Sequence, residues 1–158
     1  LLISTGNKSE MSVGYSTIYG DMNGGFNVLK DVYKTELYKL ANWRNNLNEK
    51  LFKGPSSKVI PENSITKPPS AELSLNQKDT DSLPPYEILD EILYYLIEKE
   101  FSLEEICKKG FKPSVVKKIR NLLVKSEYKR RQAPPGVKIS VRSFGKERRY
   151  PITNQFKI

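Results

Sequence analysis

The sequence predicts an α/β fold, in which part of a parallel sheet is followed by a largely helical C-terminal half and an extended tail. Three observations support this prediction. The apolar run at residues 1–3 ends in a tight turn at residues 5–7, and a helix start follows, which is the order of a buried strand, a turn and a helix. Apolar residues return with the helical period after Pro85. Residues 137–141 alternate between apolar and polar side chains, as an extended segment does.

The turn after the first strand is the place where such a fold binds ligands. In an open parallel sheet, ligands lie beyond the carboxyl ends of the strands, where a helix start offers free N–H groups and a partial positive charge. Gly6 lets a ligand approach the backbone closely, and the Thr5 hydroxyl can donate to a phosphate or ribose oxygen. Glu10 can accept from a hydroxyl or hold a hydrated cation. On spacing alone, an ordinary strand-turn-helix corner explains these residues equally well.

The next elements are a turn at residues 21–25, an extended piece at residues 26–29 and a helix that begins at Thr35 or its neighbours. Lys34 lies just before this helix or in its first turn, where a lysine opposes the helix dipole unless it serves an anion. We therefore expect Lys34 to contact a phosphate, with a solvated lysine as the alternative. The apolar residues near one face of the helix are Leu37, Leu40, Ala41 and Leu47.

Residues 52–84 are rich in Pro, Ser, Lys and Asn and have no periodicity of their own, which is typical of a linker or a functional lid. Within them, the stretch Lys67-Pro-Pro-Ser70 is rigid in φ at two positions and offers an ammonium and a hydroxyl group. We expect this stretch to close over ligand phosphates.

Helix signals return in residues 85–127. The first of these helices has an apolar face, and its acidic residues cover the other face. A capping box at residues 102–105 opens a short helix that stops at Gly110, and Pro113 takes the first position of the next helix. The residues expected to be buried are Leu89, Ile92, Leu93, Leu96 and Ile97 in the first helix and Val116, Ile119 and Leu123 in the last.

The formal net charge of +9 is concentrated near the C-terminus, where residues 128–149 hold many lysines and arginines against Glu147 alone. Such a segment favours anions: ligand phosphates, nucleic acid or the acidic face of a second subunit. Taken alone, the helices at residues 102–109 and 113–125 could form a basic helix-turn-helix that binds nucleic acid. Few side chains of the second helix could read base edges, so we favour a helical hairpin beside the sheet.

The composition excludes several kinds of chemistry within these 158 residues. There is no histidine, which removes Ser-His-Asp and Cys-His nucleophiles, histidine zinc sites and histidine general bases. The single cysteine, Cys107, forms no internal disulfide and is interpreted as a small buried side chain in a reducing compartment. No apolar run is long enough to cross a bilayer and no signal peptide is present, so we expect a cytoplasmic location without membrane contact.

A series of ordered motifs resembles the carboxy-terminal part of NAD+ synthetase. The motifs are Ser4-Thr-Gly-Asn-Lys-Ser-Glu10, Gly14-Tyr-Ser-Thr-Ile-Tyr-Gly-Asp21, Gly24-Gly-Phe-Asn-Val-Leu-Lys-Asp-Val-Tyr-Lys-Thr35, Thr66-Lys-Pro-Pro-Ser-Ala-Glu-Leu73, Pro85-Tyr-Glu-Ile-Leu-Asp90 and Lys129-Arg-Arg-Gln-Ala-Pro-Pro135. The stretch at residues 144–153 is most similar to the glutamine-dependent form of the enzyme. The match runs from the first residue almost to the last.

The resemblance implies an adenine nucleotide alpha-hydrolase-like (Rossmann-like) parallel-sheet domain and an amide-forming ligase. In that family, ATP adenylates the nicotinate carboxylate of deamido-NAD+, pyrophosphate leaves, and ammonia attacks the NAD-adenylate to give NAD+. In the glutamine-dependent form, an amidase domain supplies the ammonia. Mg2+ and fixed cations must screen the repulsion between carboxylate and triphosphate, and a lid must keep water from the acyl-adenylate. The ammonia-dependent form is the alternative.

Site residues follow from the same resemblance, with no catalytic residue assigned. Contacts to ATP are expected from Thr5, Lys34 and Ser70. Contacts to deamido-NAD+ are expected from Glu10, Tyr15, Ser16, Thr17, Ile18 and Lys129, and Glu10 is also a candidate Mg2+ ligand. Ile18 and Gly25 stand where the ammonia-dependent form has a lysine and an aspartate, which favours the glutamine-dependent form.

The resemblance also divides the chain. Residues 1–51 are expected to be the C-terminal portion of the nucleotide-binding α/β core, 52–84 a lid or linker loop, 85–127 a helical subdomain and 128–158 a basic extended tail. The family's pyrophosphate-binding loop, Ser-Gly-Gly-x-Asp-Ser, and its N-terminal amidase domain do not occur in this sequence. We therefore expect a piece of a longer protein that is inactive alone. The expected partners are its small-molecule substrates, the amidase domain of the same chain and further copies in a homo-oligomer, rather than nucleic acid.

Overall fold

A parallel pair of short strands and a set of helices make up the chain. The computed structural model describes residues 1–47, 54–55, 58–67 and 82–153. The elements in order are β1 (Ile3–Ser4), α1 (Lys8–Val13), β2 (Phe26–Asn27), α2 (Lys34–Asn46), α3 (Glu62–Thr66), α4 (Tyr86–Ile97), α5 (Leu103–Cys107), α6 (Pro113–Lys125) and α7 (Glu127–Arg130). β1 pairs with β2 in parallel, with Ile3 opposite Phe26 and Ser4 opposite Asn27. The predicted α/β class with a parallel sheet is confirmed.

The first strand differs from its prediction. The apolar residues 1–3 were expected to form a buried strand, but Leu1 is 97% and Leu2 65% exposed, and only Ser4 of β1 is buried. Among the described residues, β1 pairs with β2 alone, so no described element covers these side chains. An apolar run indicates a strand that can be buried. Whether the strand is buried depends on other elements that pack against it, which the run itself does not specify.

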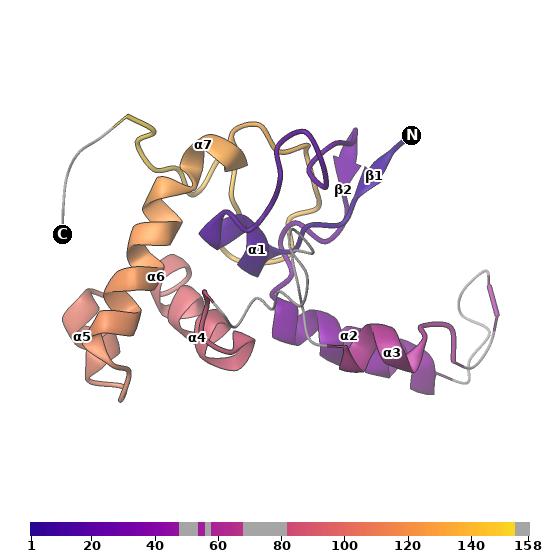
Figure 1. Ribbon diagram of the computed structural model, residues 1–158, viewed down its shortest axis with the longest axis horizontal. Coiled ribbons are helices and arrows are strands. Elements are labelled where there is room, and N and C mark those ends of the chain that lie inside the picture. The colour runs from indigo at the N-terminus through magenta and orange to yellow at the C-terminus, as the bar shows by residue number, and fades with distance from the viewer. Residues whose placement is uncertain (48–53, 56–57, 68–81, 154–158) are drawn as a thin grey trace.

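Helix α1 lies at the centre of the chain, between the strands and the helical half (Figure 1). It contacts α2, α4, α6 and α7 and carries Met11 and Val13 into the core. Asn7 and Glu10 form a capping box at its start, and Gly14 ends it with a φ of 72°. The residues of α1, which follow β1, are therefore fixed by contacts with four other helices.

The helical half confirms the sequence pattern. All the residues predicted for the apolar faces of α4 and α6 are at most 5% exposed. Ser102 caps α5 through the predicted capping box, and Pro113 is the first residue of α6. One expectation was wrong: Asp90 is an acidic residue of α4 that is buried rather than exposed, because it accepts hydrogen bonds from Ser9 and Thr35.

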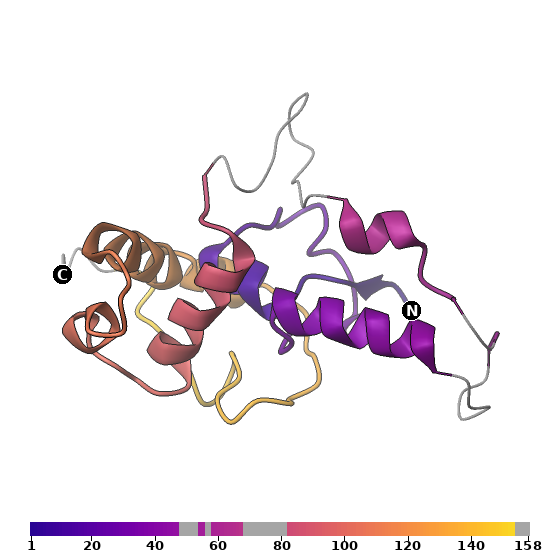
Figure 2. The same cartoon turned by 90° about the horizontal axis from the view of Figure 1, so that it is seen from below.

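Helix α2 projects from the body of the molecule, with α3 beside it (Figures 1 and 2). None of its residues is buried, and Leu40 and Trp43 are about half exposed. The apolar side predicted for this helix is therefore only partly covered by described residues. Helix α3 falls inside the segment predicted as a lid or linker, which thus contains one regular turn of structure.

The C-terminal segment runs back over the strands. Residues 137–141 were expected to alternate as an extended element, but they form no strand; Gly136 makes a single bridge to Asn27. The N–H groups of Ile139 and Ser140 instead donate to the carboxylate of Asp31. Helix α7 carries the chain to Arg130, so the extended part begins after the position that the sequence suggested, residue 128.

Candidate functional site around helix α1

The turn between β1 and α1 is closed by its own hydrogen bonds. The Asn7 side chain accepts from the N–H of Glu10, and the Glu10 carboxylate accepts from the N–H of Asn7 at 3.1 Å. From β2, the Asn27 amide donates to the carbonyl oxygen of Gly6 at 2.9 Å. Thr5 is exposed at the outer end of the turn. An exposed hydroxyl-bearing residue thus lies beside a helix start whose position is fixed.

Two of the predicted contact residues form an ion pair. The Lys34 ammonium lies 3.1 Å from the Glu10 carboxylate, and both side chains are about one fifth exposed. The same ammonium lies over the rings of Tyr38 and Tyr86, at 5.8 and 5.6 Å from their centroids. Lys34 is the first residue of α2, so Glu10 offsets the unfavourable position of a lysine at a helix start.

The other predicted contact residues gather at the opposite end of α1. Lys129, from α7, donates from its Nζ atom to the carbonyl oxygens of Gly14 and Ser16, both at 2.7 Å. Carbonyls after a helix end lack internal partners, so this ammonium stabilises both the end of α1 and the loop of residues 14–18. The Tyr15 hydroxyl is 2.9 Å from that of Ser82, Ile18 packs on the core, and Thr17 is exposed.

The structure therefore brings several of the predicted contact residues together along one helix. Glu10 is on α1, Lys34 contacts Glu10, and Lys129 contacts the residue that ends the helix. The N–H of Tyr15 donates to the carbonyl oxygen of Glu10 at 2.9 Å, which joins the two groups. Ser70, the third predicted ATP contact, lies outside the described residues.

A buried lysine next to this site is missing from the sequence predictions. Lys8 is fully buried, and its ammonium binds the carboxylates of Asp31 at 2.9 Å and Glu98 at 2.5 Å, the hydroxyl of Ser140 at 2.6 Å and the carbonyl oxygen of Arg142 at 2.9 Å. Burial raises the pKa of the Asp31 carboxyl, but the hydrogen bonds from Ile139, Ser140 and Lys8 outweigh it and hold the pKa below its ordinary value. The only sequence signal was a lysine in the first turn of a helix.

A buried arginine was assigned to the wrong environment. Arg130 was counted in the basic segment that favours anions, yet it is only 5% exposed and pairs with Glu127 at 3.0 Å. It donates to the carbonyl oxygens of Met11 and Ser12 and lies over the ring of Phe144. Arg130 therefore supports the end of α1 from inside, next to Lys129 on the same helix.

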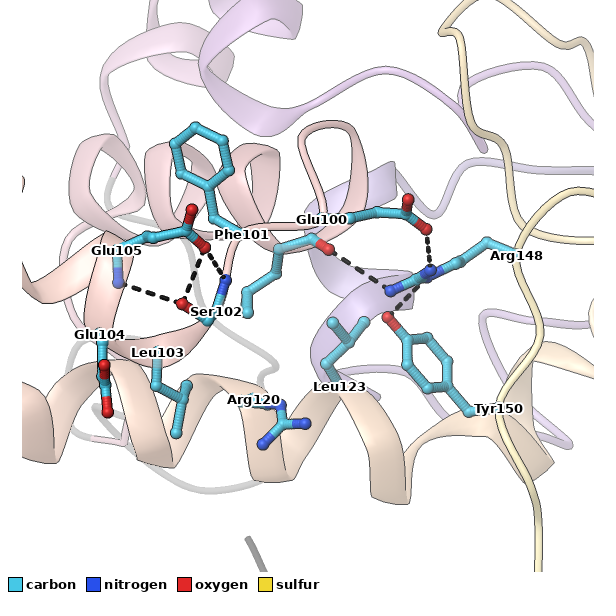
Figure 3. A pocket seen from close by; sticks show the side chains of 11 residues that line it. Glu100, Phe101, Ser102, Leu103, Glu104, Glu105, Arg120, Leu123, Arg148 and Tyr150 are labelled. Atoms are coloured by element: carbon cyan, nitrogen blue, oxygen red, sulfur yellow. Dashed lines mark hydrogen bonds and ion pairs between the residues drawn. The ribbon is translucent and has the colours of Figure 1, made fainter.

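The pocket drawn in Figure 3 lies elsewhere, between the α4–α5 connection, α6 and the C-terminal segment, with a volume of about 680 Å³. Arg148 crosses it, bonded to Glu100 at 2.6 Å and to the Tyr150 hydroxyl at 2.9 Å. None of the predicted site residues lines it. It is therefore not the site that the sequence indicated.

Comparison with known proteins assigns the chain to a family. A family model described as NAD synthase matches residues 1–133. The chain belongs to the NAD synthase family. The resemblance found in the sequence is thus confirmed, and with it the Rossmann-like α/β class of this NAD synthase chain.

Individual relatives agree with the family model. The glutamine-dependent NAD(+) synthetases of Acinetobacter baylyi and Thermotoga maritima are 56% and 53% identical over 157 residues, which is 99% of this chain. The chain spans only 28% and 26% of those relatives. A solved glutamine-dependent NAD(+) synthetase from Cytophaga hutchinsonii matches 97% of this NAD synthase chain, and 24% of its own, with a TM-score of 0.71 at 21% identity. This last likeness supports the fold.

Proposed function

We propose that the protein containing this chain forms NAD+ by ATP-dependent amidation of deamido-NAD+ through an NAD-adenylate, with nitrogen taken from glutamine by an amidase domain. The observation that carries the proposal is the family match together with the high identity to proteins named glutamine-dependent NAD(+) synthetase. The grouping of the described contact residues around α1 supports it. The division into α/β core, lid, helical subdomain and tail, at the boundaries given above, is part of the same proposal.

Each residue has a chemical task in this proposal. Lys34 turns from Glu10 to a phosphate of ATP, and the exposed Thr5 hydroxyl donates to an ATP oxygen. Lys129 keeps loop 14–18 against the end of α1, so that deamido-NAD+ meets a preformed surface. The proposed contacts of deamido-NAD+ are Glu10, Tyr15, Ser16, Thr17, Ile18 and Lys129 itself.

Glu10 also fits the requirement for a metal ion in part. Mg2+ is commonly held by one or two carboxylates together with substrate phosphates, and Glu10 offers one partly exposed carboxylate. Among the described residues, no group of three or more His, Cys, Asp or Glu side chains could hold a metal ion. Mg2+, when bound, would screen the triphosphate charge, with Glu10 as its ligand from this chain.

The location and assembly belong to the proposal as well. In the part of the chain that the structure describes, no helix is both long and apolar enough to cross a membrane. We propose a cytoplasmic homo-oligomer in which copies meet through the synthetase domain. Sedimentation of the purified full-length protein would test the assembly.

The deciding experiment is an assay of NAD+ formation by the full-length protein from deamido-NAD+ and MgATP, with glutamine or ammonium. Turnover with glutamine supports the proposal. Turnover with ammonium alone would favour the ammonia-dependent alternative, and no turnover with either donor would contradict both.

The 158-residue piece is predicted to be inactive, so NAD+ formation by this piece would contradict that prediction. Binding of duplex DNA by the same protein would favour the helix-turn-helix alternative.

A further inference from the structure

The start of helix α2 is capped by residues from two other helices. Its N-cap residue, Tyr33, makes no side-chain cap. The N–H of Lys34 donates to the Ser9 hydroxyl of α1 at 2.9 Å, and the N–H of Thr35 donates to the Asp90 carboxylate of α4 at 2.8 Å. Two free N–H groups of this helix start are thus satisfied by distant side chains, while the N–H of Tyr33 donates to the Glu36 carboxylate of the same helix at 3.4 Å.

The two capping groups are joined to each other. The Ser9 hydroxyl donates to the other oxygen of the Asp90 carboxylate at 2.5 Å, so that α1, α2 and α4 meet in one hydrogen-bonded triangle. Ser9 is fully buried and Asp90 is 5% exposed. A carboxylate at this place also faces the positive end of the α2 dipole. These hydrogen bonds therefore fix both the distance of the first turn of α2 from α1 and α4 and the direction in which α2 leaves them.

Helix α4 acts on the side chain of Lys34 as well as on its backbone. Tyr86 lies one helical turn before Asp90, so both residues lie on the same face of α4. The Tyr86 ring is 5.6 Å from the Lys34 ammonium, which is also 3.1 Å from the Glu10 carboxylate. One face of α4 thus binds the α2 backbone through Asp90 and contacts the Lys34 ammonium through Tyr86.

The carboxylate at this position carries a cost as well as a stabilising role. Among the described residues, Asp90 forms no ion pair, and a buried carboxylate without a cation costs stability. Burial accordingly raises the pKa of the Asp90 carboxyl, although the bonds from Ser9 and Thr35 oppose the shift. A serine or asparagine at the position of Tyr33 would cap the helix without burying a charge.

We propose, on the basis of the ATP contact proposed above for Lys34, that Asp90 is a positioning residue for this lysine. Through Ser9 and the N–H of Thr35, it fixes the first turn of α2 so that the Lys34 ammonium lies at the β1–α1 turn, where phosphate is expected. Asp90 touches no substrate in this proposal. It acts through Lys34 alone.

The test uses the full-length protein and the variant Asp90→Asn, which keeps the side-chain volume and one acceptor but loses the charge. We expect kcat/KM for ATP to fall about 10-fold, as for the loss of one charge-assisted hydrogen bond, while the KM for deamido-NAD+ is unchanged. An equal loss for both substrates would overturn the proposal.

A double-mutant cycle separates positioning from general stability. If Asp90 acts through Lys34, the variant Asp90→Asn/Lys34→Met is no worse for ATP than Lys34→Met alone. The matched control is Glu127→Gln on α7, an equally buried carboxylate that pairs with Arg130. Its effect should add to that of Lys34→Met. Additive losses for Asp90→Asn would overturn the proposal.

The outcomes also separate this proposal from the one on which it rests. If the unaltered protein forms no NAD+, the proposed function fails. If it is active but Lys34→Met leaves the KM for ATP unchanged, the assignment of Lys34 fails and the role of Asp90 fails with it. Where thermal unfolding shows that Asp90→Asn does not fold, Ser9→Ala replaces it in the cycle. Ser9→Ala must then also be non-additive with Lys34→Met, and additivity counts against the proposal.

Discussion

The ammonium group of Lys8 lies 2.9 Å from the carboxylate of Asp31, and both residues are almost completely buried. Lys8 begins α1 directly after the turn that holds Thr5, and Asp31 binds the backbone of the C-terminal segment at residues 139–140. Glu98, at the end of α4, accepts from the same ammonium. The proposed ATP site, the helical half and the C-terminal segment are thus joined at a single side chain.

Replacing this lysine should therefore destabilise the protein strongly. In Lys8→Met, the carboxylates of Asp31 and Glu98 lose their shared cation inside the protein. Breaking a buried pair in this way costs about 3–5 kcal/mol. We expect that loss in the free energy of unfolding of the full-length protein, measured in denaturant, with Lys117→Met on the exposed side of α6 as the control. A loss as small as that of the control would show that water reaches the carboxylates.

The two buried aspartates should act on stability with opposite signs as pH changes. The folded-state pKa of Asp31 is below its ordinary value of 3.8, so its contribution to stability is present above that pH and is lost as pH falls through the lowered pKa. The folded-state pKa of Asp90 is raised by burial, so stability falls as pH rises from 3.8 through the raised pKa.

Thermal unfolding from about pH 2 to about pH 7 would check both signs. In the unaltered protein, ionisation of Asp90 should lower stability as pH rises above 3.8, and Asp90→Asn should abolish this decrease. Ionisation of Asp31 should raise stability as pH rises towards 3.8, and Asp31→Asn should abolish this increase. Identical pH dependence in all three proteins would contradict the directions given for both carboxyl groups.

The structure was predictable from the sequence where it depends on local pattern. The apolar faces of α4 and α6 follow from the helical period, and the cap at Ser102 and the helix start at Pro113 follow from residue type within one turn. The exposure of residues 1–3 was not predictable, because burial of a strand depends on neighbouring layers.

The site shows the same division. The capped turn before α1 follows from adjacent residues, whereas Lys8 bonds to Ser140 across 132 positions and Ser9 bonds to Asp90 across 81. No local pattern links residues so far apart. The environment of Arg130 was predicted wrongly for a related reason. A run of basic residues indicates positive charge, but it does not show that one of them is buried and donates to carbonyl oxygens of α1.

The loop of residues 14–18 should depend on Lys129. Lys129→Met removes two hydrogen bonds to the carbonyl oxygens of Gly14 and Ser16 and so weakens the support of the loop. We expect the KM for deamido-NAD+ to rise about 10-fold, with the KM for ATP unchanged. Lys125→Met, at the exposed end of α6, is the matched control in steady-state kinetics. A rise in the KM for ATP alone would place Lys129 at the other substrate.

The end of α1 requires a glycine for two separate reasons. Gly14 has a φ of 72°, which is unfavourable for residues with a Cβ, and a Cβ atom there would lie 2.3 Å from the hydroxyl oxygen of Ser126. We expect Gly14→Ala to lower the free energy of unfolding by about 1–3 kcal/mol. Ser126→Ala alone should cost less, because it removes only the hydroxyl. The double variant Gly14→Ala/Ser126→Ala should recover part of the loss, since the collision with the hydroxyl oxygen is removed, while the backbone strain and the 2.9 Å approach to the Ser126 Cβ atom stay. No recovery in the double variant would mean that the Ser126 hydroxyl contributes nothing to the requirement for glycine.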